Sequence, residues 1–184
     1  TTASDNTAVG YNSLNTNTTG ATNTAVGKDS LYGNTTGSHN TAIGNAAGLS
    51  VTTGIQNVLI GTFAGDALTD ADYNTAVGYS ALGNENLGSR STALGAYALN
   101  VQRNNSATDV YNTAIGHAAG VAVTTGIQNT LIGGLAGDAI TTGDSNVTVG
   151  YASLSKLTTA DNNTAIGRGA LSEATTGAGN TGVG

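Results

Sequence analysis

Residues 6–22 read NTAVGYNSLNTNTTGAT, residues 23–39 read NTAVGKDSLYGNTTGSH, and residues 40–56 read NTAIGNAAGLSVTTGIQ. Fixed self-similarity of this kind is the signature of a repeat architecture. The interval between repeats is constant except for the longer one from Ser91 to Asn112, and the stretch that begins at Asn40 returns at Asn112. We therefore assign residues 1–184 to a single repeat domain. The repeats begin at Asn6, Asn23, Asn40, Asn57, Asn74, Ser91, Asn112, Asn129, Asn146, Asn163 and Asn180.

The positions of the repeat, numbered 1 to 17 from each start, differ in the residues they carry. Position 5 is always Gly, which predicts a corner where φ is positive or two backbones approach closely. Position 1 is Asn in all copies but one, which predicts an amide ladder or a bond to the backbone at a corner. Position 4 is always aliphatic, so we assign it to the structural core. The core residues are Val9, Val26, Ile43, Ile60, Val77, Leu94, Ile115, Ile132, Val149, Ile166 and Val183, and the turn glycines are Gly10, Gly27, Gly44, Gly61, Gly78, Gly95, Gly116, Gly133, Gly150 and Gly167.

Composition favours strands over helices and over disorder. Thr, Gly and Asn supply 80 of the 184 residues and are poor helix formers, whereas Thr, Val and Ile suit strands. Disordered chains normally carry more charge and more Pro than this one, which has 9% charged residues and no Pro. Five scattered Lys and Arg give no basic stripe for nucleic acid, and no apolar run approaches the ~20 residues that membrane insertion needs.

The repeat length predicts the architecture. A strand of three to five residues is unstable alone, but it gains a hydrogen-bond ladder when it stacks on the same strand of the next repeat. The sequence therefore predicts an all-β fold, a parallel β-solenoid or β-roll of 17-residue coils, in a rod about 50 Å long at ~4.8 Å per coil. One coil offers few large apolar residues, so we expect three copies to share an apolar seam as a homotrimer. Position 9, which is Leu or Gly, either lines that seam or packs inside its own coil.

The segments NTAVGYNSL, NTTG and NTAIG resemble repeats of phage and bacterial tail-fibre-like proteins. More distantly, NTAIG is similar to the SVAIG unit in the heads of trimeric autotransporter adhesins. The resemblance covers the whole chain and implies a trimer that recognises a host surface, a matrix or a surface glycan. The coil here is longer than that of the adhesin heads.

Two groups of residues are candidates for ligand binding. The longer repeat places an insertion at about residues 100–111, and loops on a rigid scaffold are where recognition concentrates, although an inert bulge is the alternative. The residue at position 6 differs from coil to coil, so we place this position on the surface. Its tyrosines either stack on sugar rings or are ordinary surface residues. The candidates are Arg103, Asn104, Asn105 and Asp109 in the insertion, and Tyr11, Tyr79 and Tyr151 at position 6.

Other features point to no cofactor and no metal. Asp66, Asp70 and Asp72 cluster in one repeat, but without a calcium-loop spacing they indicate solvated charge. His39 and His117 occupy different repeat positions and form no pair. The Thr-Thr pairs at positions 13 and 14 are either a flat ice-binding array or a Thr-rich corner. No nucleophile, base and acid fall into one group, so we expect no enzymatic activity.

These observations predict a structural and adhesive fibre segment that is extracellular, on a cell surface or on a virion. It would project a stiff rod and present a repetitive polar surface to a glycan or matrix ligand. Both ends lie within repeat-like sequence, which predicts that the chain is a piece of a longer protein. The alternatives are a filament assembled end to end, an ice-binding solenoid and a glycan-cleaving tailspike.

Overall fold

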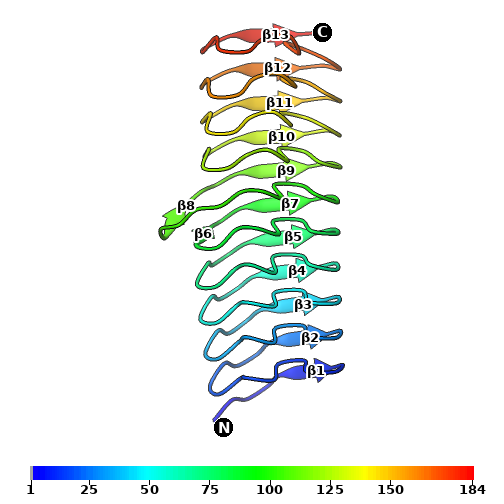
Figure 1. Cartoon of the computed structure of the whole chain (residues 1–184), viewed down its shortest axis with the longest axis vertical. Coiled ribbons are helices and arrows are strands. Elements are labelled where there is room, and N and C mark those ends of the chain that lie inside the picture. The colour runs from blue at the N-terminus through cyan, green and yellow to red at the C-terminus, as the bar shows by residue number, and fades with distance from the viewer. Residues whose placement is uncertain (1) are drawn as a thin grey trace.

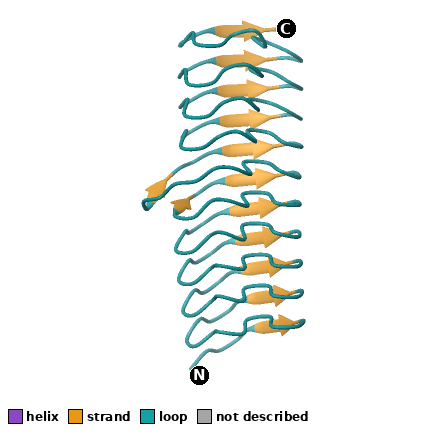
Figure 2. Ribbon diagram, in the orientation of Figure 1, coloured by secondary structure: helices purple, strands orange, loops and turns teal. Residues whose placement is uncertain are grey.

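The computed structural model describes residues 2–184 as a rod of stacked coils, with no helix in that range (Figure 1). Thr1, the first residue of the predicted repeat domain, lies outside the described residues. Figure 2 shows that each coil contributes one short strand to the same side of the rod and that turns form the rest. The predicted all-β class and the parallel β-solenoid of 17-residue coils are therefore confirmed.

The strands form one long sheet and one small lateral sheet. Eleven three-residue strands make the long sheet in the order β1-β2-β3-β4-β5-β7-β9-β10-β11-β12-β13, and each covers positions 2 to 4 of a repeat. These are β1 (Thr7–Val9), β2 (Thr24–Val26), β3 (Thr41–Ile43), β4 (Val58–Ile60), β5 (Thr75–Val77), β7 (Thr92–Leu94), β9 (Thr113–Ile115), β10 (Thr130–Ile132), β11 (Val147–Val149), β12 (Thr164–Ile166) and β13 (Thr181–Val183). The lateral sheet pairs β6 (Gly88–Ser89) with β8 (Thr108–Asp109).

Every pair in the long sheet is parallel and in register, so equal repeat positions lie side by side. Thr7 aligns with Thr24, and Thr92 aligns with Thr113 across the longer repeat. Turns are bonded between coils as well: the amide of Gly27 donates to the carbonyl of Val9 at 2.8 Å. The stacking of identical coils therefore supplies the hydrogen bonds that a three-residue strand lacks.

The assignment of position 4 to the core is wrong. The middle residue of the strand, position 3, points inward and is fully buried in every coil except the first and the last, as at Ala25 and Leu59. Successive strand residues point to opposite faces, so positions 2 and 4 must both point outward. Val9 is 56% exposed and Leu94 is 44% exposed. The residues to which this correction applies, none of which is buried, are Val9, Val26, Ile43, Ile60, Val77, Leu94, Ile115, Ile132, Val149, Ile166 and Val183.

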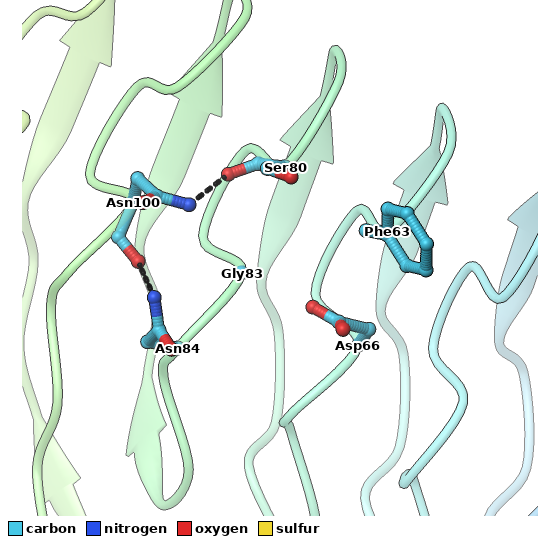
Figure 3. A pocket seen from close by; sticks show the side chains of 6 residues that line it. All are labelled: Phe63, Asp66, Ser80, Gly83, Asn84 and Asn100. Atoms are coloured by element: carbon cyan, nitrogen blue, oxygen red, sulfur yellow. Dashed lines mark hydrogen bonds between the residues drawn. The ribbon is translucent and has the colours of Figure 1, made fainter.

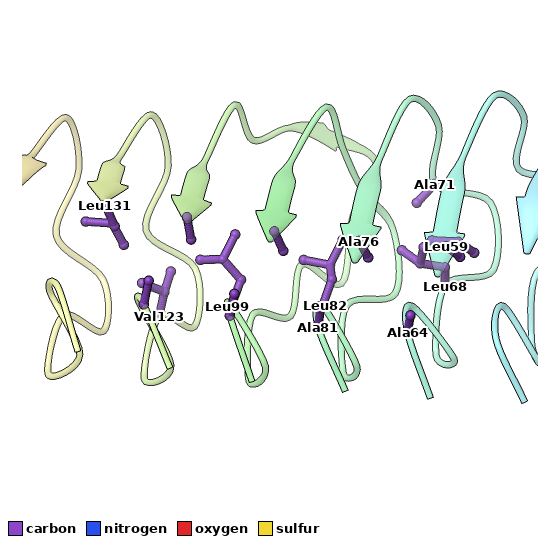
Figure 4. Close-up of a cluster of buried hydrophobic side chains, with 14 of the residues drawn as sticks. Leu59, Ala64, Leu68, Ala71, Ala76, Ala81, Leu82, Leu99, Val123 and Leu131 are labelled. Carbon is purple, nitrogen blue, oxygen red and sulfur yellow. The ribbon is translucent and has the colours of Figure 1, made fainter. Parts of the chain in front are cut away.

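In most coils the interior is instead filled by a small residue on the strand side and a large side chain on the opposite wall, whereas Leu59 and Leu131 are large residues on the strand side. Figure 4 shows Ala76 on the strand side facing Ala81 and Leu82 on the turn side. Leu82 at position 9 is fully buried, which places the Leu of that position inside its own coil and not in a seam between copies. Where position 9 is Gly, position 12 carries the bulk instead, as in the pairs Gly48 with Val51, Gly65 with Leu68, Gly120 with Val123 and Gly137 with Ile140.

The invariant glycine lies at the corner that follows each strand. Gly116 has a φ of 137°, and a Cβ built on it would lie 2.5 Å from the carbonyl oxygen of Gly133 in the next coil. Both reasons that the sequence suggested therefore apply at once, because the backbone has a positive φ and the coils touch. The same close approach recurs along the column from Gly10 to Gly167.

The Asn at position 1 forms a ladder inside the opposite corner. The side-chain Oδ1 of Asn40 accepts from the backbone amide of Asn57 at 2.9 Å, and its Nδ2 donates to the carbonyl of Gly54 at 2.8 Å. The buried side-chain amide thus accepts a hydrogen bond from the next coil and donates one to the end of its own coil. At Ser91, which lacks the amide, the buried Gln102 substitutes: its Nε2 donates to Ser91 Oγ and its Oε1 accepts from Asn112 Nδ2.

Three repeat positions adopt a left-handed conformation without being restricted to glycine. All 25 non-glycine residues with positive φ among those described fall at position 7, at position 9 or at the last residue before the next repeat start. Leu82 at position 9 has a φ of 53°, and Arg90, the last residue before Ser91, has a φ of 67°. Such residues cost roughly 1–2 kcal/mol each relative to glycine, which the stacking of coils must offset.

The insertion is tied to the rod by a fully buried carboxylate. Glu85 Oε1 accepts from the backbone amides of Asn86, Gly88 and Asn104 at 2.8–2.9 Å. Its Oε2 accepts from Gln102 Nε2 and Asn104 Nδ2. Five hydrogen bonds compensate the burial of the carboxylate, and three of them come from the segment that opens the insertion.

Candidate functional site

The outward surface of the long sheet, here called the sheet face, consists of positions 2 and 4. It carries nine Thr and two Val at position 2 and eleven aliphatic residues at position 4, so it holds no charged group. Strands lie ~4.8 Å apart, and each contributes about 10 Å of width, so the face covers about 500 Å² in projection. The aliphatic column makes up about half of that area. Because the largest apolar patch of a typical monomer covers about 300–600 Å², the column is distinguished by its continuity along the rod and not by its size.

The threonines of the sheet face are free to bond outward. Within residues 2–184, the side-chain hydroxyls of the position-2 threonines, such as Thr24 and Thr41, have no hydrogen-bond partner. The aliphatic column beside them stays partly exposed along the whole rod. This face can therefore meet either a complementary protein surface or an ordered layer of water.

A second surface is a line of rings along the corner after the strands, here called the aromatic ridge. It consists of Phe63, Tyr79, Tyr97 and His117, one from each of four successive coils. Neighbouring ring centroids lie 6.1, 5.3 and 6.2 Å apart, and each contact is edge to face. That geometry is the favoured one for aromatic pairs, so the rings hold one another in place while remaining on the surface.

A pocket of about 310 Å³ opens at one end of the aromatic ridge, and we call it the Gly83 pocket. In Figure 3 the ring of Phe63 lies above the carboxylate of Asp66, and Gly83 leaves open space beside them. Asn100 Nδ2 donates to the carbonyl of Ser80, and Asn84 Nδ2 donates to the carbonyl of Asn100, both at 2.9 Å. The amides are thereby oriented, and their side-chain oxygens remain available as acceptors.

Gly83 creates this pocket by lacking a side chain. It is the one glycine at position 10 of the repeats, where other coils carry residues such as Tyr32 and Leu49. A Cβ at Gly83 would lie 3.0 Å from Asn100 Nδ2 and 3.4 Å from Asp66 Oδ1. The glycine therefore leaves open the space between the acid of one coil and the amide of the next coil but one.

Asp66 lies half-buried in the pocket, and the residues that line the pocket include no Lys or Arg. Burial raises the pKa of the Asp66 carboxyl, and a hydrogen bond from its own backbone opposes that shift. No other side chain among residues 2–184 donates to it. The carboxylate is consequently an acceptor whose hydrogen-bonding capacity is left unused by the other side chains.

A third group of side chains surrounds Arg90 beside the insertion. The Arg90 guanidinium lies 4.7 Å from the ring centroid of Tyr73 and 6.0 Å from that of Tyr111. Its Nε donates to Asp109 Oδ1 at 2.9 Å, and this hydrogen bond raises the pKa of Arg90. The four side chains interact with one another, so this cluster serves to fasten the insertion.

The structure does not unite the predicted ligand-binding residues of the insertion. Asn104 is buried, and because both its amide and side chain bond Glu85 it cannot contact a ligand, so that candidate is wrong. Asp109 is paired with Arg90, while Arg103 and Asn105 are exposed and bond each other at 3.2 Å. The insertion lies at the edge of the rod near β6 and β8, away from the ends of the long-sheet strands (Figure 1).

The tyrosines of position 6 are also separated. Tyr11, Tyr79 and Tyr151 lie four coils apart in succession, which is about 19 Å per step. Tyr151 lines a second pocket, of about 290 Å³, together with Arg168, whose guanidinium is 5.9 Å from its ring centroid. Tyr79 alone joins the aromatic ridge, through its contact with Phe63. Of the predicted tyrosines, therefore, only Tyr79 adjoins the pocket that holds Asp66.

The Thr pairs and the aspartates serve the corners. The hydroxyl of Thr35 donates to the carbonyl of Thr52 in the next coil at 3.1 Å, so the first Thr of a pair is used internally. Asp72 accepts from the amide of Ile55 at 2.8 Å, whereas Asp70 bonds Thr53. Across the described residues no three metal-ligating side chains come together, and no helix is long and apolar enough to cross a bilayer.

Sequence reasoning missed the Gly83 pocket because its lining shares repeat positions that carry a different residue in each coil. Asp66, Gly83 and Asn100 are all at position 10, and Phe63 and Ser80 are both at position 7. Phe63 and Tyr97 are at position 7, whereas Tyr79 and His117 are at position 6, so no single column reveals the ridge. A search for rings that recur one position short of, or one position beyond, the repeat period would have found it. The comparisons with known proteins add no relative: no family model, no curated protein and no solved structure matches the chain.

Proposed function

We propose that this chain is the rod of an extracellular attachment fibre and that copies of it assemble through the sheet face. The observation that supports the proposal is the unbroken, uncharged column of Val, Ile and Leu at position 4, which water contacts in the single chain. Burying an exposed aliphatic side chain contributes roughly 1.5–3 kcal/mol when burial is complete, so eleven partly exposed ones favour association strongly.

Three copies are the expected number. The resemblance to trimeric fibres suggests the number, and the narrow sheet face, only three residues wide, suits packing around a common axis. Position 4 takes the place at that axis that was one of the two alternatives for position 9, because the Leu residues of position 9, such as Leu31 and Leu82, are already buried within their coils. Standard interfaces bury about 800 Å² per partner, so the face of about 500 Å² would supply only part of a stable interface, and the trimer would also have to bury the corners that flank it.

The experiment is the mass in solution, measured by sedimentation over a dilution series. We expect three chains for the native sequence and one chain for the double variant Ile43→Lys, Ile115→Lys. In a trimer each substitution would place three buried ammonium groups near the axis, one from each chain. The matched control is Gln56→Lys, Gln128→Lys, which adds the same charge at exposed corner positions outside the sheet face. A native protein that remains a folded monomer at all concentrations refutes the trimer.

A second function uses the same face in the single chain. The position-2 threonines have hydroxyls without partners and stand in a regular column beside the aliphatic column on a continuous parallel sheet. A monomer would leave this array open to ordered water, as an ice-binding surface requires. Thermal hysteresis separates the two: we expect none for the trimer, whereas a monomer with hysteresis that Thr24→Lys abolishes supports ice binding.

A further inference from the structure

The Gly83 pocket lies on the wall opposite the sheet face. Its residues Ser80, Gly83 and Asn84 belong to the turn segment whose buried side chains, Ala81 and Leu82, point across the interior toward the strands (Figure 4). Assembly through the sheet face would therefore leave the pocket exposed, and the aromatic ridge would lie at the corner between the two. A fibre could display three copies of the pocket around its circumference.

The polar groups of the pocket suit a ligand rich in hydroxyls. Asp66 supplies a carboxylate that accepts no hydrogen bond from another side chain. The side-chain oxygens of Asn84 and Asn100 are acceptors, and the hydrogen bonds that their own Nδ2 groups donate hold them in place. Vicinal hydroxyl groups of a sugar ring can donate in pairs to a carboxylate and to nearby amide oxygens. A pocket with a few convergent polar groups of this kind is how small-molecule sites fix orientation.

The aromatic side chains suit the other face of the same ligand. Phe63 is 36% exposed at the rim, and its ring contacts Tyr79, which leads on to Tyr97. A pyranose presents a face of C–H groups that packs against an aromatic ring, while its hydroxyls point to the side. The volume of about 310 Å³ lies at the small end for ligand sites and suits a single ring, with the ridge beside it for a neighbouring sugar.

The charge of the pocket selects the class of sugar. No Lys, Arg or His lines it, and its one ionisable group is the carboxylate of Asp66. The whole chain carries a net charge of −6. An anionic sugar would meet an uncompensated like charge, whereas a neutral sugar would not.

We propose that the Gly83 pocket and the adjoining aromatic ridge bind a neutral pyranose unit of a surface glycan. This inference rests on the proposed attachment function and gives it a site. The chain also contains a matched site with a different lining, because Asp138 is the counterpart of Asp66 in the duplicated block. There, Leu135 replaces the phenyl ring and Ser155 replaces the glycine.

The test is saturation-transfer NMR on the intact chain with four neutral probes, the methyl pyranosides of glucose, galactose, mannose and N-acetylglucosamine. N-acetylneuraminic acid serves as the anionic comparison. We expect transfer to the C–H face of at least one neutral probe and none to the anionic one. Absence of transfer to all four neutral probes overturns the inference.

Variants then assign the binding to the pocket. Gly83→Leu fills it with the residue that Leu49 already provides at this position, and no positive φ stands in the way. We expect this variant and Asp66→Asn to weaken binding at least tenfold, while Asp138→Asn leaves it unchanged. Unchanged binding in both pocket variants, with their oligomeric mass intact, overturns the site.

A cell-binding assay separates this inference from the proposed function. If the native fibre attaches to cells and the pocket variants attach equally well, attachment stands and the Gly83 pocket is not its site. If the native fibre attaches to no cell surface while the isolated pyranoside still binds the pocket, the sugar site stands and the attachment function fails.

Discussion

The corner glycines provide a direct test of how the coils hold together. Gly116 follows β9 and has a φ of 137°, a region that residues with a Cβ rarely adopt. In Gly116→Ala the new methyl group would lie 2.5 Å from the Gly133 carbonyl oxygen and 2.6 Å from its carbonyl carbon. Backbone atoms of a stacked coil cannot move aside without breaking the ladder, so the clash must be absorbed by the rod.

The magnitude follows from two separate terms. Holding a non-glycine residue at such a φ costs roughly 1–3 kcal/mol. Forcing an extra methyl group into a close-packed contact costs roughly another 1–3 kcal/mol. We therefore expect Gly116→Ala to lower the free energy of unfolding by about 2–6 kcal/mol.

Two other glycines isolate these terms. Gly169 has a φ of 69° but no heavy atom within 4 Å of an added Cβ, so Gly169→Ala carries only the conformational term, about 1–2 kcal/mol. Gly134 has no positive φ, and its nearest contact is an ordinary 3.6 Å from Tyr151 Cδ2. Gly134→Ala should leave stability unchanged or raise it by roughly 0.4–1 kcal/mol, because alanine restricts the unfolded chain.

The assay is urea unfolding followed by far-UV circular dichroism, at one fixed protein concentration because association adds to apparent stability. The expected order of stability is Gly134→Ala, then Gly169→Ala, then Gly116→Ala. Equal losses for Gly116→Ala and Gly169→Ala would refute the reasoning, since they would show that the approach of adjacent coils contributes nothing at the corner.

Three further outcomes are expected from buried and half-buried side chains. Leu82→Ala should cost about 2–5 kcal/mol by opening a cavity, and Leu82→Gly should cost no more in urea unfolding, because glycine relieves the left-handed backbone at φ 53°. Glu85→Gln should cost about 1–3 kcal/mol and expose the insertion to hydrogen exchange, since the new NH₂ group would face donors where the carboxylate now accepts five bonds. Burial raises the pKa of Asp138, so its charged form is disfavoured in the folded state; Asp138→Asn should therefore raise the melting temperature at neutral pH, and the gain should shrink as the pH falls through the raised pKa.

The architecture could be predicted because it follows from the period. Ten or more copies of one phrase impose the same backbone on each copy, and a short Thr- and Gly-rich phrase without Pro can satisfy its hydrogen bonds only by stacking. The roles of Gly at position 5 and Asn at position 1 followed from residue chemistry. Gly116 needs a conformation and a distance that other residues cannot accept, and Asn40 has a donor and an acceptor to bridge two coils.

Hydrophobicity could not predict which residues of each strand face the interior of the rod. The pattern Thr-Ala-Val has its largest apolar residue outside, because the interior is narrow and Leu82 reaches it from the opposite wall, leaving room at Ala76 only for a methyl group. The left-handed positions were equally hidden, since the stack enforces them on Leu82 and Arg90 without requiring glycine.

The candidate site shows the same division. The sequence by itself determined the period, the strand class, the corner glycines and the Asn ladder, because each is a local demand repeated in every coil. The tertiary structure decided the burial of position 3, the exposed sheet face, and the meeting of Phe63, Asp66 and Asn100 at one pocket. These depend on how walls face each other across the rod and on which neighbours stacking brings within reach, and no single repeat contains that information.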